Sequence, residues 1–412
     1  MRGEAADLSR HWTLDPEIAF LNHGSFGACP RAVLDAQRAY RERMERQPVR
    51  FLTREAPALL AQAREALARF LGASAENLAF VPNATSALNA VLRSLPLAAG
   101  DELLVTDHAY NASRNALDFV AERCGASVVV ISIPFPLESA DALLDAVLQR
   151  VGPRTRLALL DHVTSPSALV LPIAQLVPAL RARGVRVLVD GAHAPGSVPL
   201  SIAALDPDYY AGNCHKWMCA PKGAGFLYVR AELRGEVRPT VISHGANQST
   251  ARRARFRNEF DWQGTDDPTP WLCVPEAIRC VGALAAGGWP ALIARNHALA
   301  LEARRILCAA LDQPPHAPDE LLACMASVPL PASPSAEPQG LQRDPLETLL
   351  YERWRIEAPV LNATPRFSRL LRVSAHVYNR RDDYTALAGA LRELALADQP
   401  VGPNARNSAS RS

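Results

Sequence analysis

Between residues 78 and 230, short apolar runs alternate with amphipathic stretches, and this alternation limits the possible folds more than any other feature of the sequence. The runs are nearly continuous in apolar residues, as in strands that are buried on both faces. Such strands, separated by helices, predict an α/β fold with a mostly parallel sheet and helices on both faces. The predicted strands are Leu78–Val81, Glu102–Thr106, Ser127–Ile133, Thr155–Leu160, Val185–Asp190, Asp208–Ala211 and Gly225–Val229. The helical patterns between them include Ser86–Ser94, Arg114–Cys124, Ala140–Val151 and Ile173–Arg183.

The sequence on either side of this block divides into further parts. We predict an N-terminal segment (1–30), a large domain (31–286), a smaller C-terminal α+β domain (287–397) and a polar, disordered tail (398–412). Two stretches have a composition that is typical of loops. The Arg-rich residues 249–261 are expected to form a polar loop, and the Pro-rich residues 314–338 an exposed connection.

Composition excludes several classes of protein. The 42 acidic and 44 basic residues leave a net charge of +2, which removes the electrostatic argument for nucleic-acid or anionic-membrane binding. The longest apolar run, near residues 127–135, is far shorter than the ~20 residues that span a bilayer, and the first residues carry no secretory pattern. The cysteines show no C-x-x-C spacing, so we expect reduced thiols and no metal site. We therefore predict a cytoplasmic enzyme or binding protein.

Lysine is almost absent from the chain. Only two of the 44 lysine and arginine residues are lysines, Lys216 and Lys222, and they lie six positions apart. Arginine replaces lysine at most surface positions, but it cannot lose a proton and attack a carbonyl, because the guanidinium stays charged up to about pH 12. A coding bias explains why lysines are scarce, but it does not explain why the two that are present lie so close together. Their position indicates chemistry in this stretch.

An aspartate and a lysine follow neighbouring strands of the predicted sheet. Asp190 ends an apolar strand, where an unpaired carboxylate is costly, and Lys216 follows a later strand. Ligand sites of such sheets gather at the carboxyl ends of the strands. Pyridoxal 5'-phosphate requires this pair of groups, because a lysine binds its aldehyde and an aspartate keeps its ring nitrogen protonated. Taken separately, the two residues also fit a helix-capping aspartate and a surface lysine. Lys222 lies in a turn and is the weaker candidate.

A site for the phosphate is also present. Asn83-Ala84-Thr85-Ser86 directly follows a predicted strand and opens a helix, whose N-terminal amides and hydroxyls suit an anion. The same residues also fit an ordinary helix cap. His215, next to Lys216, is a further candidate for a phosphate contact.

Several motifs in order along the chain resemble those of the class V aminotransferase superfamily, whose members are fold-type I pyridoxal phosphate enzymes. Within it the sequence is most similar to the isopenicillin N epimerases. The motifs are Leu21-Asn22-His23-Gly24-Ser25, the residues from Asp107 to Tyr110, His162-Val163-Thr164-Ser165, Asp190-Gly191-Ala192-His193-Ala194-Pro195-Gly196, Tyr210-Ala211-Gly212-Asn213-Cys214-His215-Lys216-Trp217, Gly264-Thr265-Asp266-Asp267 and Leu371-Arg372-Val373-Ser374-Ala375.

The resemblance implies a role for individual residues. Lys216 would hold the cofactor and move protons at the substrate's α-carbon, and Asp190 would pair with the ring nitrogen. His193 would lie near the phenolic oxygen, and Tyr110 would stack on the ring, with His108 as a rival for that position. The residues implied to contact the phosphate or other parts of the cofactor are Ala84, Thr85, Ser165, His215 and, from a neighbouring subunit, Thr265.

The resemblance also implies residues that bind the substrate. Arg372 would bind an α-carboxylate through its two-pronged guanidinium. Without the family, Arg372 at the end of an apolar strand equally fits a structural ion pair. Asn22 and His23 would border the substrate pocket. The partners implied are a small amino-acid-type substrate and a second copy of the chain, in a homodimer with shared active sites.

The reaction implied is removal of the α-proton of an amino-acid or peptide-like substrate, as in an epimerase, with Tyr110 or water as the second proton donor. The alternatives are a carbon–sulfur lyase acting on a cysteine conjugate and an aminotransferase. A desulfurase also needs a nucleophilic cysteine on a loop. Residues 355–360, where related desulfurases carry it, contain none, and Cys324 is expected to be a core residue.

Overall fold

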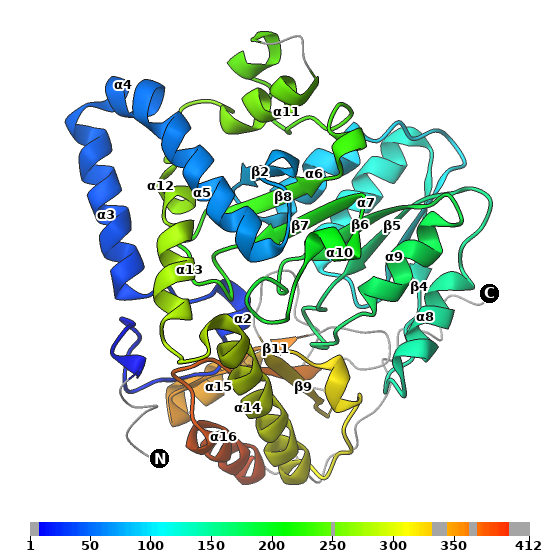
Figure 1. The fold of residues 1–412 in the computed structure, drawn as a ribbon. Coiled ribbons are helices and arrows are strands. Elements are labelled where there is room, and N and C mark those ends of the chain that lie inside the picture. The colour runs from blue at the N-terminus through cyan, green and yellow to red at the C-terminus, as the bar shows by residue number, and fades with distance from the viewer. Residues whose placement is uncertain (1–7, 249–251, 332–343, 362–368, 395–412) are drawn as a thin grey trace.

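The computed structural model describes residues 8–248, 252–331, 344–361 and 369–394 (Figure 1). Its largest element is a seven-stranded sheet. The strands are β2 (Leu78–Val81), β3 (Glu102–Thr106), β4 (Ser127–Ile131), β5 (Thr155–Asp161), β6 (Arg186–Gly191), β7 (Tyr209–Asn213) and β8 (Gly225–Val229). Their order is β2-β8-β7-β6-β5-β3-β4, and only the two contacts of β8 are antiparallel. The predicted α/β fold with a mostly parallel sheet is confirmed.

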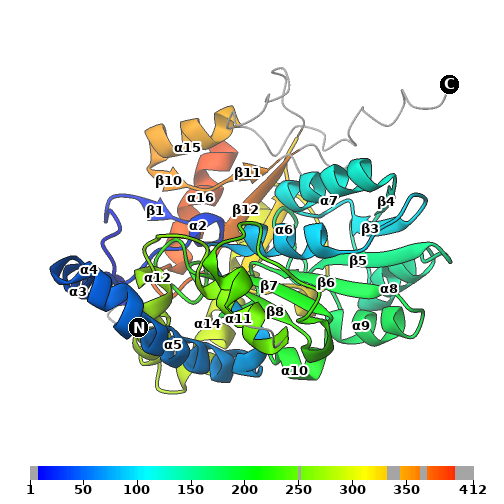
Figure 2. The ribbon, with the colours of Figure 1, turned by 90° about the horizontal axis from the view of Figure 1, so that it is seen from above.

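Helices cover both faces of this sheet, as Figure 2 shows. One face packs against α6 (Ala84–Ser94) and α7 (Asn111–Cys124), and the other against α5 (Ala56–Leu71), α8 (Ala140–Leu148) and α9 (Ile173–Arg181). Successive residues of a strand point to opposite faces. In β5, Leu157 and Leu159 therefore join the core with α6 and α7, while Ala158 and Leu160 join the opposite core.

A smaller sheet lies below the large one in Figure 1. It contains β11 (Val360–Leu361), β12 (Leu370–Ser374) and β9 (Met325–Pro329), in that order and antiparallel throughout. Helices α14 (Gly288–Ala310) and α16 (Arg381–Glu393) pack against each other, and α14 also packs on β9. The N-terminal segment joins this region, because β1 (Ala19–Phe20) pairs in parallel with β10 (Ile356–Glu357).

The remaining elements lie between these helices and strands along the chain. The other α-helices are α2 (His23–Phe26), α3 (Arg31–Arg46), α4 (Pro48–Arg50), α10 (Ile202–Leu205), α11 (Arg252–Asp261), α12 (Thr269–Leu272), α13 (Val274–Gly282) and α15 (Pro345–Trp354). Single turns of other helix types are η1 (Phe51–Glu55), η2 (Ala75–Asn77), η3 (Ala231–Leu233), η4 (His244–Asn247) and η5 (Asp319–Leu321). Within the described ranges, no helix combines the length and the apolar character needed to cross a bilayer.

Two predictions about loops were wrong. Most of the expected polar loop 249–261 is helix α11, in which Phe256 and Phe260, one helical turn apart, pack with ring centroids 5.0 Å apart in the core. The expected exposed connection 314–338 contains the fully buried strand β9. In both stretches the arginines or prolines dominate the composition and hide a short apolar pattern. The predicted disordered tail lies outside the described residues.

The end of β6 is packed so closely that residue 191 has to be glycine. A Cβ atom on Gly191 would lie 2.1 Å from Cε1 of Tyr210. That ring is fully buried, and its hydroxyl lies 2.8 Å from Nδ1 of His162, so it has little freedom to move. The close approach sets the path of the chain that follows Asp190.

We predict that Gly191→Ala lowers the free energy of unfolding by about 1–3 kcal/mol, because the new methyl group overpacks the core. Gly389→Ala is the control, since a Cβ at Gly389, on the exposed side of α16, meets nothing within 4 Å. The control should stabilise the protein by about 0.5–1 kcal/mol. Urea unfolding followed by circular dichroism measures both. Equal effects of the two substitutions would contradict the packing argument.

Candidate active site

A cavity of about 220 Å³ opens at the carboxyl ends of β5, β6 and β7. Side chains from several distant segments of the sequence line it. They are Ser25 and Phe26 from α2, Asn83, Ala84 and Thr85 at the start of α6, Tyr110 before α7, Asp161, Val163 and Ser165 from the end of β5, Asp190, Ala192 and His193 from the end of β6, and Asn213, His215 and Lys216 from the end of β7. Most of the residues predicted to contact the cofactor are therefore brought together.

The N-terminus of α6 faces this cavity. The side chain of Asn83 caps the helix and accepts the backbone N–H of Ser86 at 2.9 Å. Asn213 Oδ1 accepts the backbone N–H of Ala84, also at 2.9 Å, and so ties the first turn to the end of β7. The predicted cap and the predicted anion site are compatible, because Thr85 still presents its hydroxyl to the cavity at the positive end of the helix dipole.

His215 lies beside the same helix terminus. Its Nδ1 is 3.1 Å from the carbonyl oxygen of Ala224, which can only accept, so Nδ1 carries the proton. Burial lowers the pKa of His215 to about 4, the hydrogen bond to Ala224 opposes this shift, and the charges of Lys216 and Lys222 add to it. The ring is therefore neutral, and its Nε2 becomes a donor to an anion only if it takes up a proton.

Asp190 carries a buried carboxylate, which forms no ion pair with a cationic side chain of the described residues. Its Oδ2 accepts the hydroxyl of Ser113 at 2.9 Å, and its Oδ1 accepts the backbone N–H of Ala192 at 3.1 Å. Burial raises the pKa of Asp190, while these two hydrogen bonds and the charge of Lys216 oppose the rise. Among the described residues, no arginine, lysine or histidine nitrogen lies within 4.0 Å of the carboxylate. A buried carboxylate in this setting suits a ligand that carries a protonated ring nitrogen.

Lys216 is positioned by a chain of two aromatic side chains. Its Nζ lies 3.0 Å from Nε2 of His193, and the indole N–H of Trp217 donates to Nδ1 of His193 at 3.5 Å. If Nδ1 accepts, the neutral imidazole carries its proton on Nε2 and donates it to the lysine nitrogen. Only an uncharged amine can accept that hydrogen bond.

The surroundings of Lys216 favour the same uncharged form. Burial, followed by the charge of Arg372, lowers its pKa to about 7, while Asp190 and Asp161 oppose the shift. The pKa of His193 is lowered well below its usual value by burial and by the charge of Lys216, so this ring is also neutral. A neutral lysine amine is the form that attacks an aldehyde.

The structure distinguishes the two candidates for stacking on the cofactor. Tyr110 lines the cavity and is 47% exposed. His108 is buried, its Nδ1 lies 2.7 Å from the hydroxyl of Ser167, and its ring packs edge-on against Phe135. Since His108 faces the core, Tyr110 is the one of these two candidates that is available to a ligand.

Arg372, on β12, is not among the residues that line the cavity, but it contacts two residues that do. Its Nη1 donates to the carbonyl oxygen and the hydroxyl of Ser165 at 2.7 and 3.0 Å, and its Nη2 donates to the hydroxyl of Ser25 at 2.8 Å. Asn22 is 8% exposed and accepts hydrogen bonds from Ser25 and Arg372, so it supports these side chains and does not line the cavity.

The charge of Arg372 is not compensated by a carboxylate. Within the described ranges no acidic side chain pairs with it, its Nε has no hydrogen-bond partner, and burial lowers its pKa to about 10. Arg372 is therefore not part of a structural ion pair among the described residues. A buried, unpaired guanidinium beside a cavity suits a ligand carboxylate.

His23 does not border the cavity as expected. It lies behind Lys216, fully buried, where its Nε2 is 3.1 Å from the carbonyl oxygen of Lys216 and its Nδ1 is 2.6 Å from the hydroxyl of Tyr378. Because a carbonyl only accepts, Nε2 carries the proton and Nδ1 accepts from Tyr378. His23 therefore ties the backbone at Lys216 to the small sheet region.

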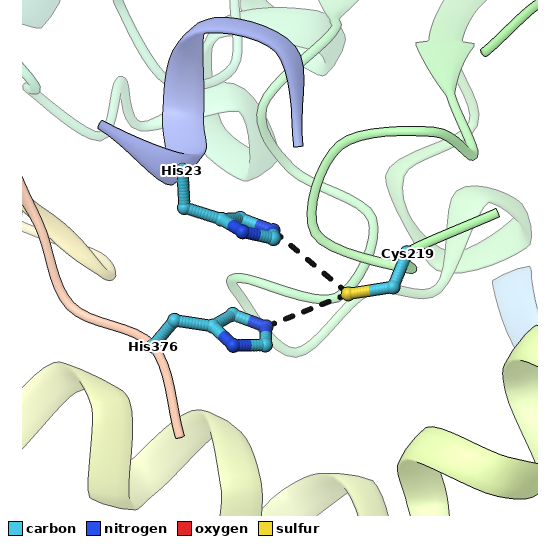
Figure 3. A group of neighbouring side chains, drawn as sticks. All are labelled: His23, Cys219 and His376. Carbon is cyan, nitrogen blue, oxygen red and sulfur yellow. Dashed lines mark hydrogen bonds between the residues drawn. The ribbon is translucent and has the colours of Figure 1, made fainter. Parts of the chain in front are cut away.

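His23, Cys219 and His376 form a buried group that Figure 3 shows. The sulfur lies 3.8 Å from Nε2 of His23 and 3.5 Å from Nε2 of His376, and the two rings stack with centroids 4.0 Å apart and planes 20° apart. Zinc accepts such donors. However, Nε2 of His23 is already protonated toward Lys216, and an ion between stacked rings would lie outside both ring planes. The group fits packing better than metal binding.

Thr265 lies elsewhere. It lines a separate cavity of about 630 Å³, together with residues of α5, α6 and α12. Within one chain it is not part of the Lys216 cavity, so its predicted phosphate contact depends on a second subunit.

Sequence reasoning missed four residues of the site. Ser113 and Trp217 act through Asp190 and His193, as described above, and Asn213 orients Ala84. Asp161 lines the cavity from the end of β5. Asn213 and Asp161 were predictable, because each is the polar residue that ends an apolar strand.

A neutral lysine, a buried carboxylate that lacks a cation, and a helix N-terminus together fit an aldehyde, a ring nitrogen and a phosphate. This fold and this site define a pyridoxal 5'-phosphate enzyme of fold type I. The chain belongs to the class V aminotransferase family, whose model matches residues 21–307. The resemblance, the fold type and the cofactor are thereby confirmed.

Relatives of known name include enzymes of different reactions. Isopenicillin N epimerase of Amycolatopsis lactamdurans is 40% identical over 403 residues, which cover 94% of this chain and 98% of the relative. A probable chloroplastic L-cysteine desulfhydrase of Arabidopsis thaliana is 32% identical over 94% of this chain and 85% of the relative. Among solved structures, the cystine C–S lyase C-DES in complex with cysteine persulfide matches 94% of this chain and 99% of its own, with a TM-score of 0.74 and 24% identity. This match shows a likeness of fold.

We predict that cofactor reduced onto the protein with borohydride is found on Lys216. Because the chain has only one other lysine, Lys222, whose Nζ donates to the carbonyl of Gly27 at 3.0 Å, peptide mass spectrometry can separate the two. Lys216→Ala should lose the label, and Lys222→Arg should keep it. Labelling of Lys216→Ala at the wild-type level would refute this assignment.

We also predict that the apoprotein couples to pyridoxal with an initial rate that rises through pH 7 and then levels off. With a pKa of about 7, half of the Lys216 amine is uncharged at that pH, compared with roughly one in three thousand for an ordinary lysine. The coupling is trapped with borohydride and counted by mass spectrometry. Free lysine serves as the reference, and a protein profile that climbs in parallel with it to pH 10 would contradict the lowered pKa.

Proposed function

We propose that the protein is an epimerase that inverts the α-carbon of an amino-acid or peptide-like substrate. The observation that carries this proposal is the presence of two proton-bearing side chains in one cavity, Lys216 after β7 and Tyr110 after β3. Strands β6 and β5 lie between β7 and β3, so Lys216 and Tyr110 enter the cavity from opposite sides. Inversion needs a proton removed on one side and returned on the other. The similarity to the Amycolatopsis epimerase over nearly the whole chain supports the same reaction.

The site residues divide the work in the following way. Pyridoxal phosphate supplies an electron sink when bound, which acidifies the hydrogen on the substrate's α-carbon. Lys216, kept neutral by burial and by Arg372, takes that proton. Tyr110 donates its hydroxyl proton from the other flank. His193 holds the lysine nitrogen in place, Asp190 holds the ring nitrogen, and Thr85 binds the phosphate, joined by His215 when its ring takes up a proton.

Arg372 binds the α-carboxylate of the substrate in this proposal. Its guanidinium is buried and pairs with no carboxylate of the described residues. Its Nη1 donates to Ser165 and its Nη2 to Ser25. A carboxylate at this place orients the α-carbon between the two proton donors.

We further propose that the enzyme works in the cytoplasm as a homodimer, in which Thr265 of one chain completes the phosphate site of the other.

A carbon–sulfur lyase acting on a cysteine conjugate is the second candidate. The 32% identity to the Arabidopsis desulfhydrase over most of the chain favours it. The desulfurase version of this chemistry is disfavoured, because no cysteine lines the cavity among the described residues. Cys324 is fully buried, and its Sγ donates to the carbonyl of Ser197 at 3.3 Å, so it is a core residue. An aminotransferase is the remaining alternative of the family.

Incubation of the holoenzyme with amino-acid and peptide substrates in deuterated water separates these reactions. We predict deuterium at the α-carbon and inverted configuration, followed by proton NMR and chiral chromatography. Tyr110→Phe should slow inversion by roughly 10²–10⁴-fold, the usual contribution of a positioned acid. It should leave α-proton exchange by Lys216 largely intact. Release of pyruvate and a sulfur product without exchange in intact substrate would establish the lyase instead.

A further inference from the structure

The floor of the active-site cavity carries a second aspartate that the roles above do not use. Asp161 ends β5 and pairs in register with Asp190 of the neighbouring strand β6. Leu159 and Leu188, two residues earlier in each strand, face the core with α6 and α7, so both carboxyl groups point to that same face. The two acids are therefore close neighbours on one side of the sheet.

Asp161 is almost completely buried but incompletely hydrogen-bonded. Its side chain lines the cavity, the residue is 3% exposed, and its Oδ2 has no hydrogen-bond partner among the described residues. Asp190, in contrast, has one donor on each oxygen, Ser113 and Ala192. A buried polar atom without a partner is costly and indicates a ligand that satisfies it.

The unequal hydrogen bonding decides which acid is charged. Two adjacent carboxylates in a dry site cannot both ionise without a large penalty. Asp190 accepts the two hydrogen bonds that stabilise a negative charge. If the pair of acids carries one proton, that proton is therefore on Asp161. Burial, followed by the charge of Asp190, raises the pKa of Asp161 well above its usual value, while a backbone hydrogen bond from Tyr110 and the charge of Lys216 oppose the rise.

We propose that Asp161 is a further ligand-binding residue, a neutral carboxylic acid whose O–H donates a hydrogen bond to an oxygen anion of the group bound in the cavity. This role also keeps Asp190 as the ionised member of the pair, available to the protonated ring nitrogen. The acceptor oxygen belongs to the phenolic group of the cofactor or to the carboxylate of the substrate. The proposal rests on the cofactor of the proposed function and not on its epimerase outcome.

Two substitutions of similar size separate hydrogen bonding from packing. Asp161→Asn keeps a neutral side chain with an N–H donor, whereas Asp161→Leu removes the donor. If the acceptor is the phenolic oxygen, the leucine variant should bind pyridoxal phosphate roughly 10- to 100-fold more weakly, the usual effect of a lost hydrogen bond to a charged group. The asparagine variant should stay within about threefold of the wild type. Titration of apoprotein with cofactor, followed by absorbance and tryptophan fluorescence, measures this without turnover.

If the acceptor is the substrate carboxylate instead, cofactor affinity stays constant. The leucine variant then shows a raised substrate dissociation constant in a titration of the holoenzyme with a non-reacting α-methyl amino acid. A leucine variant that binds both ligands like the wild type overturns the proposal.

Carbon-13 NMR of apoprotein labelled at the aspartate carboxyl groups tests the protonation directly and does not depend on how the leucine variant folds. The Asp161 signal is identified by its absence in Asp161→Asn. It should show the chemical shift of a protonated acid at pH 7, and the shift of a carboxylate there would overturn the proposal. Failure of wild-type apoprotein to bind the cofactor at all would count against the proposed function, and not against Asp161.

Discussion

The contact between the Lys216 amine and the imidazole of His193 is the interaction on which the rest of the site depends. With the proton of the neutral imidazole on Nε2, as the contact between Trp217 and Nδ1 of His193 favours, the imidazole donates and the uncharged amine accepts. The buried guanidinium of Arg372 helps to enforce this. Two cations in one dry site repel each other, and arginine holds its proton far more strongly than lysine. Lys216 therefore gives up its proton and becomes a nucleophile near neutral pH.

The same logic of competing charges applies to the acids on the floor of the cavity. Asp190 and Asp161 come from paired positions of two strands, and the donors Ser113 and Ala192 select Asp190 as the charged one. One negative and one positive charge then remain fixed, on Asp190 and Arg372. These are the charges that suit the protonated ring nitrogen of the cofactor and the carboxylate of a substrate, so both charges are in place before any ligand arrives.

Much of this arrangement could be predicted from local sequence. Asp190, Lys216 and the helix start at Ala84 each follow an apolar strand, and parallel strands bring their carboxyl ends together. The same rule applies to Asp161, which could have been found in this way. The choice between Tyr110 and His108 could not be predicted. The two residues lie two positions apart in an irregular segment, so the sequence does not tell which side chain faces the cavity.

Other features depend on contacts between distant segments, which one sequence does not encode locally. His23 belongs to a motif that suggests the pocket, yet its ring is held behind Lys216 by Tyr378, far away in the chain. Strand β9 and helix α11 were missed because each is a short apolar stretch within a segment rich in prolines or arginines, and becomes informative only once a partner is known. For β9 that partner is β12, the strand that also carries Arg372.

The exposure of the two proposed proton donors differs, and this difference bears on the proposed reaction. Lys216 is partly exposed, whereas Tyr110 is 47% exposed and lies with Phe26, which is 68% exposed, among the residues that line the same cavity. A tyrosine open to water exchanges its proton with solvent between turnovers, while a less exposed lysine exchanges more slowly and returns some of the protons that it removed. An epimerase built in this way draws the incoming proton for one direction from solvent and retains part of the substrate's own proton in the other. The asymmetry follows from the walls of the cavity and not from the cofactor.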